Sequence, residues 1–149
     1  MNRSGRLLCV AVLIIAACGC WQRLPLVPVT GVVVSGTTAV EGAEVVFLSD
    51  KPGNPPAAGK TDAAGRFRLK TYWHARKKEL DGASPGAYRV VVSKVSWPPL
   101  GNSMSGEPKS LNPPAATNVL AERYRSANTS GLSAEVRHGE VNDFTFTLE

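Results

Sequence analysis

The chain has 149 residues, with 17 Lys and Arg against 12 Asp and Glu, so its formal net charge at pH 7 is +5. This length fits one domain with its own core. The modest excess of basic residues lacks the clustering of a nucleic-acid-binding face, so we expect no nucleic-acid partner. All three cysteines lie within the first 20 residues, which leaves the rest of the chain to fold without a disulfide.

Residues 1–17 have the composition of a secretory signal peptide. Arg3 and Arg6 make the start basic, and residues 7–17 form an uncharged run of eleven mostly apolar residues. A membrane-spanning helix needs about 20 apolar residues. A basic start, an apolar stretch of roughly 7–15 residues and small residues at its end are typical of a cleaved signal. We therefore expect residues 1–17 to be removed on export.

The end of this segment, Ile15-Ala16-Ala17-Cys18, resembles the bacterial lipobox, in which a branched apolar residue and two small residues precede the lipidated cysteine. The resemblance implies diacylglycerol and palmitate on Cys18, and an anchor in a bacterial cell membrane with the domain facing the periplasm or the exterior. Cys20 is an alternative attachment site, because small residues also precede it. Two unmodified cysteines after an ordinary signal are the third possibility.

Residues 18–28 include Pro25 and Pro28 and are predicted to form the lipidated cysteine and an extended tether. The domain is expected over residues 29–149, where apolar residues recur with a period of two. This alternation is typical of strands with one buried and one solvated face, as in antiparallel sheets. We expect strands over Thr30–Ser35, Ala43–Ser49, Arg66–Lys70, Tyr88–Lys94, Leu132–Arg137 and Phe144–Leu148.

Short strands separated by turns that contain Gly and Pro predict an all-β fold, an antiparallel β-sandwich. Its core has no candidate charged centre. The side chains expected to face the core are Val45, Phe47, Phe67, Leu69, Tyr88, Val90, Val92, Leu132, Val136, Phe144, Phe146 and Leu148.

The sharpest turn motif is Thr61–Phe67. Asp62 can accept hydrogen bonds from backbone N–H groups, and Gly65 can take the left-handed conformation that closes the turn. Metal binding by Asp62 is the alternative, although Ala63 and Ala64 supply no side-chain oxygen beside it.

Two segments interrupt the strand pattern. Tyr72–Asp81 carries a basic cluster, and Val95–Asn118 contains five prolines, which exclude a central strand. After them, Val119–Tyr124 is predicted to form a turn or two of helix. Loops on a rigid sandwich are the usual place for binding residues. The candidate ligand or partner contacts are Trp73, His74, Arg76, Lys77, Lys78 and Trp97.

These contacts have plainer interpretations. The two tryptophans can instead cover the ends of the sandwich, and the basic cluster can be a solvated loop.

Several of these motifs together resemble the carboxypeptidase regulatory-like domain. Val29–Val34 and Val40–Phe47 are similar to its opening, and the Thr61–Phe67 turn and Pro85–Val90 to its next landmarks. The tail from Tyr124 to Phe144 is similar to the endings of small bacterial lipoproteins that carry it. The resemblance covers most of residues 29–149 and implies a transthyretin-like sandwich of about seven strands in Greek-key order.

The resemblance implies no catalysis, because in carboxypeptidases this domain accompanies the catalytic unit. The chain has only two histidines, His74 and His138, 64 residues apart and without a zinc-ligand spacing. We expect no catalytic residue, cofactor or metal, and a membrane-tethered module of the cell envelope with a structural or protein-interaction role. A carbohydrate-binding lipoprotein that uses Trp73 and Trp97 is the alternative.

Overall fold

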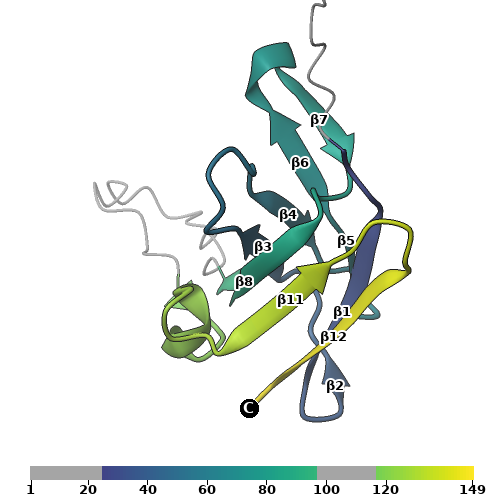
Figure 1. Ribbon diagram of the computed structural model, residues 1–149. Coiled ribbons are helices and arrows are strands. Elements are labelled where there is room, and N and C mark those ends of the chain that lie inside the picture. The colour runs from purple at the N-terminus through teal and green to yellow at the C-terminus, as the bar shows by residue number, and fades with distance from the viewer. Residues whose placement is uncertain (1–24, 97–116) are drawn as a thin grey trace, which may run out of the picture.

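The computed structural model describes residues 25–96 and 117–149, and this part of the chain is almost entirely β-structure (Figure 1). The predicted all-β sandwich is confirmed. The described strands form two main sheets that face each other, and two short 3-10 helices, η1 (His74–Arg76) and η2 (Glu122–Arg125), lie between strands. The second helix takes the place of the helical turns expected over Val119–Tyr124. The predicted lipid sites Cys18 and Cys20 lie outside the described residues.

The first sheet is four-stranded and is built around its longest pair. Strand β1 pairs with β12 on one side and with β2 and β5 on the other. β1 and β12 run parallel, with Val29 opposite Asn142 and Ser35 opposite Leu148. This one pairing departs from the antiparallel expectation, because residue alternation reports which face is buried and not strand direction. The bounds are β1 (Val29–Ser35), β2 (Thr38–Ala39), β5 (Arg66–Arg68) and β12 (Asn142–Leu148).

The second sheet is six-stranded and antiparallel throughout, in the order β11-β8-β3-β4-β6-β7. A separate short pair, β9 (Val95–Ser96) with β10 (Thr117–Asn118), follows β8. The bounds of the six strands are β3 (Glu44–Leu48), β4 (Ala57–Lys60), β6 (Lys70–Trp73), β7 (Lys78–Asp81), β8 (Gly86–Ser93) and β11 (Leu132–Val136).

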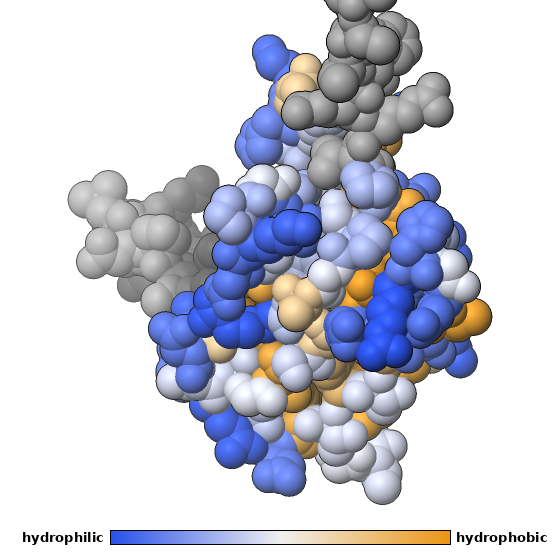
Figure 2. Space-filling view, in the orientation of Figure 1, coloured by the Kyte–Doolittle hydropathy of each residue, from blue (hydrophilic) through white to orange (hydrophobic). Residues whose placement is uncertain are grey.

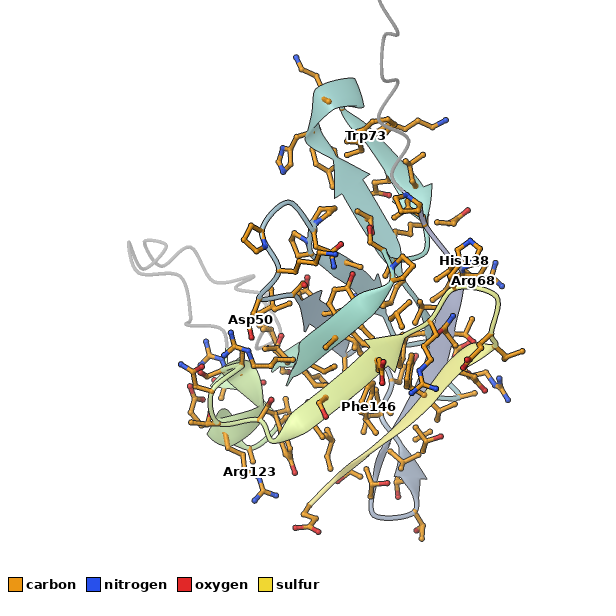
Figure 3. The ribbon with its side chains drawn as sticks, in the orientation of Figure 1. Asp50, Arg68, Trp73, Arg123, His138 and Phe146 are labelled. Atoms are coloured by element: carbon orange, nitrogen blue, oxygen red, sulfur yellow. The ribbon has the colours of Figure 1, made fainter. Side chains whose placement is uncertain are left out.

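Aromatic side chains join the two sheets. The ring of Phe47, on β3, lies 6.3 Å from that of Phe67 and 6.0 Å from that of Phe146, both from the opposite sheet. It also lies 5.7 Å from the ring of Tyr88 on β8. Tilted and edge-on ring pairs at these distances are favourable beyond their buried area. Phe47 is therefore at the centre of the interface between the layers, and Figure 3 labels Phe146 there.

Ten of the twelve predicted core residues are buried, and Leu132 and Phe144 are partly buried against the same cluster. The prediction missed Val29 and Val33, which are fully buried on the inner face of β1. Val29 lies just before the predicted start of this strand at Thr30, and Val33 lies in the run Val32–Val34, where alternation is hard to see.

The Thr61–Phe67 turn has the predicted geometry. Asp62 Oδ1 accepts hydrogen bonds from the N–H groups of Ala64 and Arg66, both at 2.9 Å. Gly65 has a φ of +72°, and the next side chain but one, Phe67, is buried. The carboxylate thus satisfies backbone donors, as expected of an Asx turn.

Two segments differ from the predicted elements. The single strand expected over Arg66–Lys70 is two strands, because the chain passes from one sheet to the other at Leu69. The expected irregular segment Tyr72–Asp81 is mostly a hairpin, in which β6 and β7 pair from Lys70–Asp81 to Trp73–Lys78 around η1. The sequence of this hairpin does not alternate apolar with polar residues, because most side chains of β6 and β7 are not buried.

Candidate interaction surfaces

The tip of the β6–β7 hairpin gathers most of the predicted contact residues. The side chains of His74, Lys77 and Lys78 are exposed, and Trp73 is half-buried. Trp73 is opposite Lys78 in the register, and Figure 3 shows it at the end of the molecule away from Arg123. We call residues 73–78 the hairpin tip. The side chain of Arg76 and the whole of Trp97 lie outside the described residues.

The tip is closed by a left-handed residue. Lys77 has a φ of +49° and donates its backbone N–H to the carbonyl of His74 at 3.2 Å. The ring of His74 in turn packs edge-on against Tyr72, with 4.8 Å between centroids. These contacts fix the backbone of the tip and leave both lysine side chains in solvent. Figure 2 shows mainly hydrophilic residues at this end of the viewed face.

A hollow of about 750 Å³ lies on the outer face of the six-stranded sheet, beside the hairpin. We call it the outer groove. Val46 and Ala58, cross-strand neighbours on β3 and β4, line it with their half-buried side chains. Tyr72 and Val95, which are 44% and 52% exposed, also line it. The charged residues that border it are Glu44, Lys60, Lys70 and Glu79.

The charges around the outer groove are balanced. Lys70 Nζ lies 3.8 Å from Glu79 Oε2 across the hairpin, with both side chains more than half exposed. Glu44 is paired in register with Lys60. Exposed ion pairs contribute little to stability, but two acids and two bases give the groove no net charge. The surface therefore suits a neutral, partly apolar ligand better than a polyanion.

The sequence interpretation did not identify the groove residues. Tyr72 begins the segment that is predicted to be irregular, and Val46 is an outward position between the predicted core residues Val45 and Phe47. Their shared face follows only from strand pairing, since Val46 is opposite both Ala58 and Val91. The sequence signal of the groove is a set of apolar residues at outward positions of β3, β4 and β6, and it has no meaning until the strand neighbours are known.

Two buried tyrosines hold loops in place. The hydroxyl of Tyr88 donates to the carbonyl of Ser84 at 2.7 Å and accepts from Asn54 Nδ2 at 2.9 Å. Burial raises the pKa of Tyr88 above its ordinary value, although both hydrogen bonds act in the other direction. The hydroxyl of Tyr124 accepts from the backbone N–H of Glu149 at 2.8 Å and from Arg123 at 2.7 Å. Each hydroxyl is held by structural partners.

Histidines and acids do not form a metal site in the part of the chain that the structure describes. No group of three His, Cys, Asp or Glu side chains there is arranged to hold an ion. His74 is on η1, whereas His138 is in the turn between β11 and β12, and Figure 3 labels it far from the hairpin tip. Asp62, the alternative metal ligand, uses one oxygen for two backbone donors.

No family model, curated protein or solved structure matches this chain. Within residues 25–96 and 117–149, no helix combines the length and apolar character needed to span a bilayer.

Proposed function

We propose that the protein is an exported, lipid-anchored module of the bacterial cell envelope, whose transthyretin-like, carboxypeptidase regulatory-like sandwich binds a partner protein and catalyses nothing. Support for the anchor comes from the sequence of residues 1–18. Support for the binding role comes from the outer groove, which offers an apolar floor bordered by charged residues.

The observation that carries the binding role is the combination of floor and rim in the outer groove. Val46 and Ala58 remain half-exposed on a central pair of strands, and balanced charges surround them. Interfaces commonly have an apolar centre with a polar rim. The chemistry fits a peptide segment with apolar side chains, and the balanced rim does not favour phosphate-rich ligands.

Crosslinking in native membranes tests the binding role. A photoreactive amino acid at Ala58 should give a discrete crosslinked protein, whereas the same group at Thr145, exposed on the other sheet, should not. Ala58→Arg should abolish the crosslink formed from a second groove position, Tyr72, and Thr145→Arg should preserve it. Equal crosslinking from both sheets would contradict the groove as the binding surface.

Mass spectrometry of the mature N-terminus tests the anchor separately. The expected result is loss of residues 1–17 and acyl chains on Cys18, and Cys18→Ser should leave the protein unprocessed or release it from membranes. Acyl chains on Cys20 would move the site and keep the mechanism. An unmodified N-terminus would refute the anchor.

Carbohydrate binding is the second candidate, favoured by the exposed ring of Tyr72 at the rim of the groove. Aromatic faces stack on sugar rings, and nearby polar groups such as those of Lys70 and Glu79 can bind hydroxyls. Glycan arrays separate the two candidates. Carbohydrate binding would be supported if the chain binds a glycan on the array and Tyr72→Ala removes that binding. It would be excluded if no glycan is bound and a protein crosslink forms.

A further inference from the structure

The chain enters the domain at the base of the β6–β7 hairpin. Val27 and Ala83 exchange two backbone hydrogen bonds, at 2.9 and 3.0 Å. The neighbouring Gly82, with a φ of +100°, lies so close that a Cβ there would be 2.2 Å from the carbonyl oxygen of Val27. The segment before β1 is therefore fixed to Gly82 and Ala83, the residues that directly follow β7.

The distance from this point to the lipid is limited by the chain itself. Cys18 precedes Val27 by nine residues, and nine fully extended residues span at most about 30 Å. The base of the hairpin must stay within that distance of the bilayer to which Cys18 is attached.

The hairpin extends from this base on the same side. Figure 1 shows it rising from the sandwich beside the first described residues, with the C-terminus at the opposite end. β7 has four residues, so at about 3.3 Å per residue the tip stands roughly 10–13 Å beyond the base. This reach is well within the distance of about 30 Å that the tether allows, so the tip can touch the bilayer while the chain stays anchored.

The side chains at the tip match an anionic membrane surface. Between Trp73 and Lys78 the sequence has three cations, Arg76, Lys77 and Lys78, and no acid. The lysine side chains are exposed, and the half-buried Trp73 precedes them. Basic residues are attracted to anionic headgroups, and indole rings favour the interface between headgroups and acyl chains. The acids of the hairpin, Glu79 and Asp81, are nearer its base.

We propose that the hairpin tip rests on the anionic lipid surface of the membrane that anchors the chain. This inference rests on the lipid anchor of the proposed function. The anchor and the tip together make two attachments, which fix the orientation of the domain. Because Lys70, Tyr72 and Glu79 belong to both the hairpin and the outer groove, the tip also sets the direction in which the groove faces.

Vesicle binding by the unacylated mature chain tests the tip without the anchor. Residues 18–149 with Cys18→Ser and Cys20→Ser should sediment with vesicles of 3:1 phosphatidylcholine and phosphatidylglycerol, and far less with phosphatidylcholine alone. About 1 kcal/mol per basic residue near such a surface corresponds to about five-fold each. Lys77→Asn with Lys78→Gln should therefore weaken binding by roughly 25-fold. Asn is chosen because it tolerates the left-handed backbone of residue 77.

The matched control removes two exposed arginines that lie away from the hairpin tip, Arg66→Gln on β5 with Arg125→Gln on η2. The control lowers the net charge by the same two units as the tip variant. It should nevertheless weaken vesicle binding by less than about two-fold relative to the original chain, because surface charges act only within a Debye length of about 10 Å. Binding should fall in high salt, and Trp73→Phe should weaken it while circular dichroism stays unchanged.

Three results would overturn the inference: no binding to anionic vesicles, equal losses in the tip and control variants, or a tip variant that keeps vesicle binding and loses a protein crosslink. The last result would assign the tip to a protein partner. Since none of these measurements uses the acyl chains, failure of the tip and failure of the anchor are distinguishable.

Discussion

Gly31, in the middle of β1, is a position where one methyl group has no room. A Cβ there would lie 2.3 Å from the carbonyl oxygen of Phe144 and 2.5 Å from Cζ of Phe67. The first contact is with the backbone of β12, which cannot move without separating the parallel pair. The glycine is therefore required by close packing, and not by an unusual φ.

Gly31→Ala is expected to lower the free energy of unfolding by about 3 kcal/mol, at the upper end of the range for overpacking. Gly53→Ala is the control: its Cβ would meet nothing within 4 Å, and only its φ of +79° opposes the change, at about 1 kcal/mol. Urea denaturation of both variants measures the difference. Equal losses would contradict the close-packing argument.

Tyr124→Phe isolates one hydroxyl group. The ring is 4% exposed and should remain packed, but the backbone N–H of Glu149 and the guanidinium of Arg123 lose their acceptor. We expect a loss of about 1 kcal/mol and faster amide exchange at the end of β12. Arg123→Gln, which keeps the hydroxyl, should leave that exchange nearly unchanged.

At the scale of elements, the Thr61–Phe67 turn was predictable in detail, because Asp and Gly have conformational roles that the sequence states directly. The passage between sheets at Leu69 was not. Alternation continues through Arg66–Lys70 without a break, yet Leu69 donates its N–H to Val29 and accepts from Gly82. Strand β4 was also missed, since Ala57-Ala58-Gly59-Lys60 has no β-branched or aromatic residue.

The candidate surfaces show the same difference between local features, which the sequence reveals, and strand pairing, which it does not. The hairpin tip was found from its composition, because cations and an indole in one short segment are visible in sequence. The outer groove depends on which strands are neighbours, and residues from β3, β4, β6 and β8 come together only in the folded sheet. Side-chain identity predicted the first surface, whereas the second required long-range pairing.

Asp62→Ala tests the turn as an element. It removes the acceptor for two backbone N–H groups and should cost about 1–2 kcal/mol of unfolding free energy. Asp62→Asn retains an acceptor oxygen and should cost under about 0.5 kcal/mol. Thermal unfolding with and without added Ca²⁺ completes the test, and a calcium-dependent rise in Tm lost in both variants would favour the metal-binding alternative.

For the whole molecule, the buried hydroxyl of Tyr88 predicts how stability responds to alkali. Burial raises the pKa of this phenol above its ordinary value of 10.0, so the folded state holds the proton more tightly than the unfolded state. Its contribution is fully present below pH 10 and is lost as the pH rises through the folded-state pKa. Guanidinium denaturation between pH 8 and 11 should show this loss.

Tyr88→Phe supplies the comparison. The variant loses the hydrogen bonds to Ser84 and Asn54 and should be less stable at pH 8 by about 1–2 kcal/mol. Its stability should then fall less steeply above pH 10 than that of the original chain. Parallel curves would show that Tyr88 does not carry the alkaline dependence.

The parallel pairing of β1 with β12 has a consequence for the order in which the protein can form. Thr30 Oγ1 donates to Asp143 at 2.9 Å across 113 residues of chain, and β1 leaves the ribosome long before β12 does. N-terminal segments are made first, and contacts this distant in sequence slow folding. Until residues 142–148 have been made, one side of β1 has no partner, so the first sheet cannot be completed before β12 is available.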